Sequence, residues 1–333
     1  MVSESLRTTS SFGVPAARGG PADVSILVPA KDEAESLPLF MELAAETFAT
    51  HPDVRFEVIV VDDGSVDDSW NVLQQLRSQY PFLRAVRHRS RRGIADALRT
   101  AYLSSAGRVL VFYPADLQFK PEDIPRLVQP ILDDTADMVT GFKEGKYEKA
   151  FVSSIYNGLS RALFHVPVKD LNSVKAYRRE IMDVLPVRPD WHRYMIVIAA
   201  SQGFTVTEIP VPLYPRHAGR SKFGISRIPI GVLDMLSVWF ELRFGKKPLL
   251  LFGMLGAGLF ALGTLAGLVA LVVLLVSGIG LRSVWTVIQT CLILGSVLFA
   301  TGLLGEQIAG QRAEVRELRR QLDEVRATRH SDA

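Results

Sequence analysis

The sequence predicts an α/β domain followed by a hairpin of two membrane-spanning helices. Short apolar, β-branched runs alternate with helical stretches between residues 23 and 224. Alternation of this kind with short connections is typical of a sheet that helices cover on both faces. Two long runs without a charged residue follow, at residues 248–281 and 283–305. Because about 20 helical residues cross the roughly 30 Å core of a bilayer, each run is long enough to span it.

Composition excludes several other classes of protein. The 333 residues are 48% hydrophobic and 22% charged, which does not fit a disordered chain, a collagen or a small disulfide scaffold. A formal net charge of +3, from 38 basic and 35 acidic residues, is too balanced for a dedicated nucleic-acid binder. The single cysteine, Cys291, excludes an internal disulfide, and no Cys/His cluster has zinc-site spacing.

The first domain begins with three strand signals. Residues 24–28, 57–61 and 109–112 are β-branched apolar runs that suit buried parallel strands. Helical patterns lie between them, at residues 35–50, 67–80 and 94–105. In sheets of this kind ligands bind beyond the carboxyl ends of the strands. The residues that follow each strand are therefore the first candidates for a functional site.

Carboxylates follow all three predicted strands. Glu33 lies just beyond the first strand, which ends near Pro29, Asp62 and Asp63 follow the second, and Asp116 follows the third. Such groups can hydrogen-bond a nucleobase or ribose, hold a hard cation or cap a helix. Capping is the simpler interpretation of Asp67 and Asp68, which directly precede a helical run. It explains Asp62 and Asp63 less well, because they precede the turn glycine.

Asp116 and Gln118 are candidate metal ligands. Two residues apart in an extended segment, their side chains would point the same way. Oxygen ligands suit Mg²⁺ or Mn²⁺ bridged to phosphate, a mode in which the protein supplies only one or two ligands. A surface loop is the alternative explanation of this pair.

Basic residues occur where phosphates could meet them. Lys143 and Lys169 lie in the second half of the domain, and Arg216, Arg220 and Lys222 lie in the loop before the membrane-proximal segment. Attraction to anionic lipid is the simpler role for that loop. The glycines at 219 and 224 suggest a loop that moves.

The distribution of Lys and Arg predicts the orientation of the hairpin. Only Arg282 lies between the spans, whereas both outer flanks are basic: Arg243, Lys246, Lys247, Arg312, Arg316, Arg319 and Arg320. We expect a multi-pass protein of the cytoplasmic (inner) membrane, with the large domain and both termini in the cytoplasm. A pair of buried core helices is the alternative to a membrane hairpin.

The remaining segments complete the expected organisation. Residues 1–22 contain no apolar run, and we expect a disordered lead rather than a signal peptide. Residues 225–247 predict interfacial amphipathic helices, with a domain-core helix as the alternative. Residues 306–333 predict an amphipathic tail with coiled-coil-like spacing, which permits a homodimer or homotetramer.

Five motifs in order resemble glycosyltransferase family 2. They are Pro-x-x-Asp-Glu at 29–33, Val-Asp-Asp-Gly-Ser at 61–65, Ala-Asp-Leu-Gln at 115–118, Asp-Leu-Asn-Ser at 170–173 and Gly-Arg-Ser-Lys-Phe at 219–223. With the hairpin, they look like the polyprenyl-phosphate glycosyltransferases related to dolichyl-phosphate mannose synthase and to bacterial two-span undecaprenyl-phosphate enzymes. The resemblance covers about residues 24–305.

The resemblance implies a GT-A fold, in a domain at residues 23–224, and a set of site residues. Those of the nucleotide-sugar donor would be Pro29, Glu33, Asp62, Asp63, Asp116 and Lys222. Asp116 and Gln118 would hold Mg²⁺ or Mn²⁺, and Lys143, Lys169 and Ser173 would bind the lipid phosphate. Asp116, Lys169 and Asp170 are the expected catalytic residues.

Four positions depart from the family pattern. The metal motif usually reads Asp-x-Asp-x-Gln, and Pro114 stands here at its first acid. Asp32 and Ser36 replace asparagines, and Ala95 replaces a common glycine. The loss of one negative charge should lower cation affinity without abolishing it, because Asp116, Gln118 and the donor diphosphate still supply oxygens.

The expected reaction is the transfer of a sugar from a UDP- or GDP-hexose to a polyprenyl phosphate, with inversion, on the cytoplasmic face. The phosphate nucleophile already carries negative charge at neutral pH, given a second pKa of about 6, and needs no strong base. Two alternatives remain: a non-catalytic sensor-like homologue, or a family 2 enzyme with another lipid or glycan acceptor. A purely structural oligomerisation protein would leave the residues at the strand ends unexplained.

Overall fold

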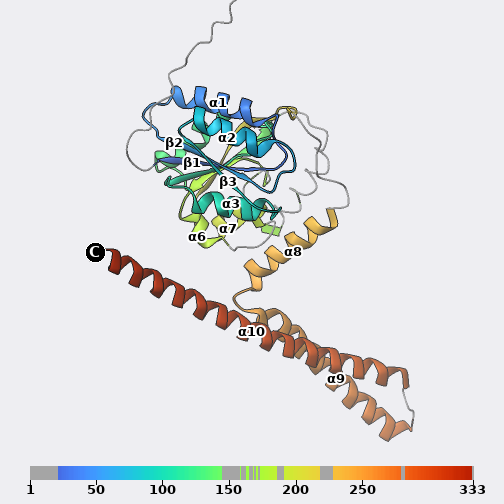
Figure 1. Ribbon diagram of the computed structural model, residues 1–333. Helices are drawn as coiled ribbons and strands as arrows, with labels where there is room; N and C mark the ends of the chain where they lie inside the picture. Colours follow the sequence, from blue (N-terminus) through green and yellow to red (C-terminus); the bar gives the residue numbers. More distant parts are fainter. Residues whose placement is uncertain are drawn as a thin grey trace, which may run out of the picture. The chain divides into compact units, whose positions relative to one another are not determined.

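The computed structural model describes residues 22–144, 158, 163–164, 168, 170–171, 173–185, 191–217, 228–278 and 282–331. The chain divides into two compact units, Met1–Met235 and Leu236–Ala333. The first unit is an α/β layer structure, and the second is helical (Figure 1). The predicted lead at residues 1–22 lies outside the described residues except for Ala22.

One half of the sheet is parallel and contains the three predicted strands. β1 (Val24–Ala30) lies between β2 (Phe56–Asp62) and β4 (Val109–Phe112), and pairs in parallel with both. β3 (Leu83–Arg87) extends this half in parallel beyond β2. The carboxyl ends of β1, β2 and β4 consequently meet at one edge, as the sequence predicts.

The other half of the sheet contains an antiparallel strand. β6 (Lys175–Arg178) pairs antiparallel with both β4 and β5 (Met138–Glu144), and β7 (Val206–Pro212) pairs in parallel with β5. The complete order is β3-β2-β1-β4-β6-β5-β7. Because β6 runs against β4, its first residue, Lys175, lies opposite Phe112 at the carboxyl end of β4. The sheet thus brings a lysine to the edge where the carboxylates gather.

Helices cover both faces of the sheet (Figure 1). α1 (Leu37–Ala49) and α2 (Ser69–Gln79) lie on one face. α3 (Ile94–Leu103), α6 (Ile181–Val184) and α7 (Met195–Ser201) lie on the other. α4 (Ile124–Leu132) follows a 3₁₀ turn, η1 (Pro121–Asp123), and η2 (Trp191–Tyr194) precedes α7. The predicted helices at 35–50, 67–80 and 94–105 are confirmed, each two or three residues shorter than predicted.

The core forms because alternate residues of the central strands point to opposite faces and both faces are buried. Ile26 and Val28 of β1 pack with Phe40 and Met41 of α1 in one core cluster. All four side chains are fully buried. This packing fixes the strands, and with them the positions of the loops that follow their carboxyl ends.

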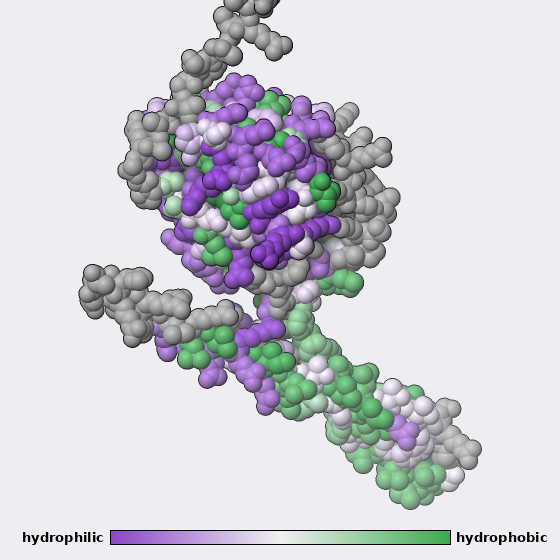
Figure 2. Space-filling model, viewed as in Figure 1, coloured by the Kyte–Doolittle hydropathy of each residue, from purple (hydrophilic) through white to green (hydrophobic). Residues whose placement is uncertain are grey.

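The second unit is a hairpin of two long apolar helices preceded by most of α8 (Ile228–Phe244). The two candidate spans are α9 (Pro248–Ser277), with a mean hydropathy of 2.8, and residues Val284–Val315 of α10 (Arg282–Ser331), with 2.1. Only 11% and 17% of the respective spanning windows are buried, so these are not the core helices of a soluble protein. Figure 2 shows hydrophobic residues gathered over this hairpin. Both helices are long and apolar enough to cross a membrane.

Glycines allow α9 and α10 to pack closely. A Cβ at Gly256 would lie 2.5 Å from the Phe299 backbone N, and one at Gly295 would lie 2.7 Å from the Phe260 backbone N. Small residues of this kind let backbones approach where lipid offers no hydrophobic driving force between helices. At one end of the hairpin, the Leu249 N–H at the start of α9 donates to Glu306 Oε2 of α10 at 3.3 Å.

The membrane-proximal and terminal segments differ in detail from expectation. α8 is one helix, and apolar residues lie on its exposed as well as its buried side: Leu233 is 65% exposed, whereas Met235 and Val238 are buried. The expected tail is the continuation of α10, without a break after the membrane span. Ile308, Val315 and Leu318 of its predicted heptad pattern are each about half exposed in the single chain. These features leave the interfacial and oligomeric roles of both segments as predictions.

Candidate active site

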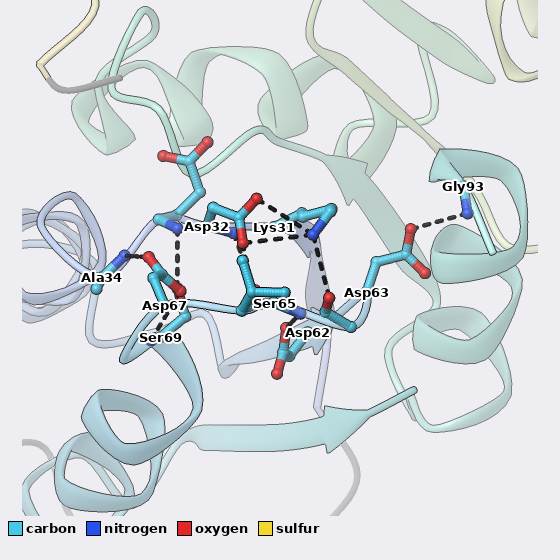
Figure 3. A network of polar contacts seen from close by, with 12 residues as sticks. Lys31, Asp32, Ala34, Asp62, Asp63, Ser65, Asp67, Ser69 and Gly93 are labelled. Atoms are coloured by element: carbon cyan, nitrogen blue, oxygen red, sulfur yellow. Dashed lines mark hydrogen bonds and ion pairs between the residues drawn. The ribbon is translucent and has the colours of Figure 1, made fainter. Parts of the chain in front are cut away.

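Two loops at the carboxyl ends of β1 and β2 are tied together by a polar network (Figure 3). The Asp32 N–H donates to Ser65 Oγ at 2.9 Å, and the Glu33 N–H donates to Ser69 Oγ at 2.8 Å. Lys31 Nζ donates to the Gly64 carbonyl at 3.1 Å and pairs with the Asp32 carboxylate at the same distance. These contacts join positions more than 30 residues apart in the chain, so the two loops form one rigid rim.

Backbone conformation explains two residues of this rim. Asp32 has φ 53°, in the left-handed region that Asn and Asp visit most readily among residues with a side chain. The departure from Asn to Asp at this position therefore keeps the backbone conformation accessible. Gly64 has φ 69°, and a Cβ there would lie 2.7 Å from the Arg91 backbone N. Glycine at the turn is thus required both by conformation and by space.

Asp67 supports the capping interpretation of the carboxylates that precede α2. Its Oδ1 accepts the Ser69 N–H at 3.0 Å at the start of the helix, and its Oδ2 accepts the Ala34 N–H at 3.2 Å. Asp68 stands at the N-cap position, but its side chain accepts from Asn71 Nδ2 rather than from a backbone N–H of the first turn. Both residues serve the local structure, as their sequence position suggests.

Asp62 and Asp63, the two predicted donor-binding acids after β2, are buried and internally paired. Asp62 Oδ1 accepts the Ser65 N–H at 2.8 Å, and its Oδ2 lies 3.1 Å from Arg87 Nε as an ion pair without a directed hydrogen bond. Asp63 Oδ1 accepts the Arg92 N–H at 2.8 Å and is 2.9 Å from His88 Nδ1. Its Oδ2 accepts the Gly93 N–H at 2.8 Å.

The surroundings of Asp63 favour its charged form. Burial by itself raises the pKa of this carboxyl, but the hydrogen bonds from His88 and from the backbone of Arg92 and Gly93 outweigh it and lower the pKa below its ordinary value. Asp63 therefore anchors the loop that leads into α3. Pro29 lies in β1 opposite Val61, and Glu33 lies in the rim, both half-buried. The structure thus places Pro29, Glu33, Asp62 and Asp63, four of the six predicted donor residues, around one sheet edge.

The segment after β4 brings Asp116 and Gln118 together by a turn. The expected extended conformation is wrong: Leu117, between them, has φ 57°, and the Gln118 N–H donates to Asp116 Oδ1 at 3.2 Å. A left-handed non-glycine residue is uncommon and is often found at functional sites. Despite the different conformation, the two side chains do converge.

Arg216, which follows β7, lies on that point of convergence. Its Nη2 is 2.9 Å from Asp116 Oδ2 and 3.3 Å from Gln118 Oε1. Burial raises the pKa of Asp116 above its ordinary value, and the nearby charge of Arg216 opposes that rise. The carboxylate is only 8% exposed and is thus stabilised by a cation placed directly on it.

The donor set at this point fits a divalent cation. A carboxylate oxygen and an amide oxygen already share a single positively charged nitrogen, and both are ligands that Mg²⁺ accepts. Across the described residues, no group of three or more His, Cys, Asp or Glu side chains gathers as a protein-only metal site. A cation here would therefore draw its remaining ligands from substrate phosphate or water.

A second charged group lies at β5 and β6. Lys143 Nζ pairs with Asp170 Oδ2 at 3.1 Å, and Asp170 is 5% exposed. Ser173 is 1% exposed, and its Oγ has no hydrogen-bond partner among the described residues. The structure brings these three predicted residues together. Lys169 and Lys222, the other predicted cations, lie outside the described residues.

Lys175 is a member of this group that sequence reasoning missed. It is 1% exposed, its Nζ donates to the Ser173 carbonyl at 2.7 Å, and it lies 5.5 Å from the centre of the Phe112 ring. Burial lowers the pKa of this ammonium to about 7, which the charge of Asp170 opposes and that of Lys143 reinforces. Its place two residues after the Asp-Leu-Asn-Ser motif was the available signal.

Comparison with known proteins identifies the family. Residues 25–161 match the family Glycosyl transferase family 2. Dodecaprenyl-phosphate galacturonate synthase of Rhizobium johnstonii is 31% identical over 86% of this chain and 88% of its own length. Undecaprenyl-phosphate 4-deoxy-4-formamido-L-arabinose transferase of Pseudomonas savastanoi is 29% identical over 88% of this chain and 87% of its own.

Solved structures confirm the expected fold. Glucosyl-3-phosphoglycerate synthase from Mycobacterium tuberculosis, in complex with Mn²⁺, UDP and phosphoglyceric acid, has a TM-score of 0.53 at 21% identity. The match covers 68% of this chain and 81% of that one. The same enzyme with Mg²⁺ and UDP matches with a TM-score of 0.53 at 20% identity, over 68% and 82% of the two chains. The first unit has the GT-A fold, and the chain is a glycosyltransferase that belongs to glycosyl transferase family 2.

Proposed function

We propose that this enzyme transfers a sugar from a nucleotide sugar to a polyprenyl phosphate at the cytoplasmic face of the membrane. The observation that carries the proposal is the union, in one chain, of a GT-A site with a cation-binding pair of oxygens and a hairpin of two spanning helices. The names of the two relatives, both transferases that act with polyprenyl phosphates, support the acceptor. The structures with UDP support a nucleotide donor.

The nucleotide-sugar donor would bind at the sheet edge formed by the carboxyl ends of β1, β2 and β4. Pro29 and Glu33 lie beside the two loops of this edge. Asp62 and Asp63 accept hydrogen bonds from backbone N–H groups of the following loops, which supports a positioning role for Asp62 and Asp63. Asp116 and Gln118 would hold Mg²⁺ or Mn²⁺, whose chemistry is to offset the charge that develops on the leaving diphosphate. Lys222 would contact that diphosphate from the loop after β7.

The acceptor phosphate belongs to the group of charged residues at β5 and β6. Lys143 and Lys169 would offset the repulsion between the two anionic substrates, which is electrostatic preorganisation. Asp170, paired with Lys143 at 3.1 Å, orients that lysine, and this contact supports its place in the catalytic machinery. The buried Ser173 hydroxyl without a partner would donate to a phosphate oxygen once the acceptor enters.

The reaction we propose is a single displacement. A phosphate oxygen of the acceptor attacks the anomeric carbon, and the bond from that carbon to the donor diphosphate breaks on the opposite side, which inverts the configuration. No proton must be removed from the nucleophile, because its second pKa is about 6. The residues of the site therefore need only hold two anions in line and stabilise the leaving group.

The membrane hairpin keeps the enzyme where its acceptor is, because an isoprenoid chain does not leave the bilayer. Basic residues on the outer flanks of the hairpin support a cytoplasmic placement of both ends. A reporter that folds only in the cytoplasm should be active when it is fused after Ala333. Activity of a reporter that requires export would contradict this orientation.

Product formation by the full-length protein in detergent tests the proposal. A short-chain polyprenyl phosphate is supplied with a panel of UDP- and GDP-sugars, with and without Mn²⁺ or Mg²⁺, and lipid products are identified by mass spectrometry. Asp116→Asn should strongly reduce a product that wild type forms only with metal. Asp123→Asn is the matched control, since Asp123 is also buried and pairs with an arginine, Arg126, at 3.2 Å.

The outcomes separate the alternatives. Transfer to diacylglycerol or a glycan, but not to polyprenyl phosphate, would replace the proposed acceptor. Retention of the donor's anomeric configuration, read by NMR of the product, would refute the single displacement. The absence of product from every donor, with nucleotide binding intact, would refute the proposed function.

A further inference from the structure

Arg216 occupies the position at which Asp116 and Gln118 converge, and the structure fixes it there by more than one contact. Besides the side-chain contacts at 2.9 Å and 3.3 Å, the backbone of its segment pairs with the Asp116–Gln118 segment. The Tyr214 N–H donates to the Gln118 carbonyl at 3.0 Å, and the His217 N–H donates to the Asp116 carbonyl at 3.3 Å. Arg216 lies between these two bonds.

The segment that carries Arg216 is anchored on its other side as well. Lys120 Nζ lies 4.3 Å from the centre of the Tyr214 ring, a cation–π contact. Arg216 is thus not a surface side chain that happens to reach a carboxylate: its side chain is only 26% exposed. The main chain is therefore held on both sides of Arg216, at Tyr214 and at His217, while the guanidinium itself is held by Asp116 and Gln118.

The charges at this point balance without a metal. Pro114 leaves Asp116 as the sole acid of the 114–118 segment, and Arg216 contributes one positive charge to its one negative charge. A divalent cation bound to Asp116 Oδ2 and Gln118 Oε1 would take the oxygens that the guanidinium now holds. The two cations would also repel each other at contact distance beside the largely buried Asp116.

We propose that Arg216 is the resident cation of the metal site and that divalent metal binds only by displacing it. The inference rests on the proposed function, because it takes a nucleoside diphosphate as the ligand that makes the exchange favourable. Diphosphate oxygens add metal ligands and also offer the displaced guanidinium new acceptors. In the absence of nucleotide, Arg216 keeps the affinity for metal low.

Linkage gives this proposal a measurable consequence. If nucleotide and metal together displace Arg216, each should strongly increase the affinity for the other, by the same factor. Without the guanidinium, nothing competes with the metal for Asp116 and Gln118. Metal should then bind tightly in the absence of nucleotide, and nucleotide should increase the affinity for metal by a smaller factor. A residue that merely stabilised the loop would not increase metal affinity when it is lost.

Mn²⁺ titration of the full-length protein in detergent, followed by electron paramagnetic resonance of free Mn²⁺, tests the proposal without measuring turnover. Without nucleotide, Arg216→Gln should bind Mn²⁺ at least tenfold more tightly than wild type. UDP, and GDP in a second arm, should tighten Mn²⁺ binding far more in wild type than in Arg216→Gln. The double variant Asp116→Asn/Arg216→Gln should not bind Mn²⁺ more tightly than wild type, a result that would locate the metal at Asp116.

The matched control is Arg126→Gln, which removes an arginine paired with Asp123 at 3.2 Å and should leave Mn²⁺ affinity unchanged. Thermal unfolding establishes that each variant is folded, and Arg216→Met provides a second variant should Arg216→Gln be unstable. Unchanged or weaker Mn²⁺ binding in both variants, with nucleotide-dependent Mn²⁺ binding intact in wild type, would overturn the inference alone. Absence of Mn²⁺ binding in every protein, with nucleotide present, would overturn the role of metal in the proposed function as well.

Discussion

The carboxylates after β2 and the carboxylate after β4 lie at the same sheet edge but are held in different ways. Asp63 accepts two backbone N–H groups and contacts a buried histidine, all of them fixed parts of the fold. Asp116 is held mainly by one side chain, Arg216, from a segment that follows the last strand. An acid whose partners are all fixed parts of the fold maintains a loop. Asp116 accepts one N–H from its own turn and otherwise faces a side chain from a distant segment, so it is the better candidate for binding a ligand.

The largest effect we expect is on turnover, from Asp116→Asn. The substitution removes the only acid of the 114–118 segment, and we expect turnover to fall by about 10³-fold, the upper range for the loss of one electrostatic group in an active site. The melting temperature should change by less than about 4 °C, because the partly exposed Arg216 guanidinium that is left behind can be hydrated. Lipid product and thermal unfolding are measured on the same preparation. A large loss of stability would place Asp116 with Asp63 as a structural acid.

Asp63→Asn should show the opposite pattern. The three donors are His88 and the backbone N–H groups of Arg92 and Gly93. The amide N–H₂ of asparagine cannot accept a hydrogen bond, so one of them loses its acceptor, and we expect the fold to be destabilised by about 2–3 kcal/mol. The control is Asp68→Asn, because Asp68 is exposed and accepts only from Asn71 among the described contacts, which predicts a change within about 0.5 kcal/mol. Denaturant unfolding measures both. Weaker nucleotide binding by Asp63→Asn at unchanged stability would restore the direct donor contact that the sequence predicts.

The contrast between these acids also marks what sequence reasoning could reach. Strands at 24–28, 57–61 and 109–112 were predictable because burial on both faces makes them continuous β-branched runs. β3 reads LRAVR and β6 reads KAYR, and neither short, charged segment resembles a buried strand. The polar motifs located the edge and assigned the metal to Asp116, but they did not reveal that Asp63 is held inside the fold, because its partners come from elsewhere in the chain. Arg216 contacts Gln118 across 98 residues, a distance that no local pattern reveals.

Two glycines of the hairpin also differ in their surroundings. A Cβ at Gly256 would lie 2.5 Å from a backbone atom of the facing helix, whereas one at Gly258 would meet nothing within 4 Å. Gly256→Ala should therefore destabilise the hairpin by about 1–3 kcal/mol, the usual range for overpacking. Gly258→Ala should be neutral or slightly stabilising, because Ala is the better helix former. Thermal unfolding in detergent compares the two, and equal melting temperatures would contradict the close packing of α9 and α10.

The smallest expected effect concerns Lys175, the buried lysine of the charged group at β5 and β6. Its pKa falls to about 7 in the folded protein, from 10.5, because burial penalises the ammonium. Between these values the unfolded chain binds more protons than the folded one, so the contribution of Lys175 to stability rises with pH, by at most about 1.4 kcal/mol per pH unit. In Lys175→Met this contribution is absent, and the lost bond to the Ser173 carbonyl does not depend on pH.

The melting temperature of wild type should therefore increase relative to that of Lys175→Met from pH 7 to pH 9.5. Val174→Ala is the control, because it removes buried volume next to Lys175 in the chain without changing a titratable group, so its difference from wild type should not vary with pH. A constant difference between wild type and Lys175→Met would mean that Lys175 stays protonated in the fold and that Asp170 neutralises it. In that case the acceptor side, like the β4 edge, would hold a carboxylate through an exchangeable cation rather than through the backbone.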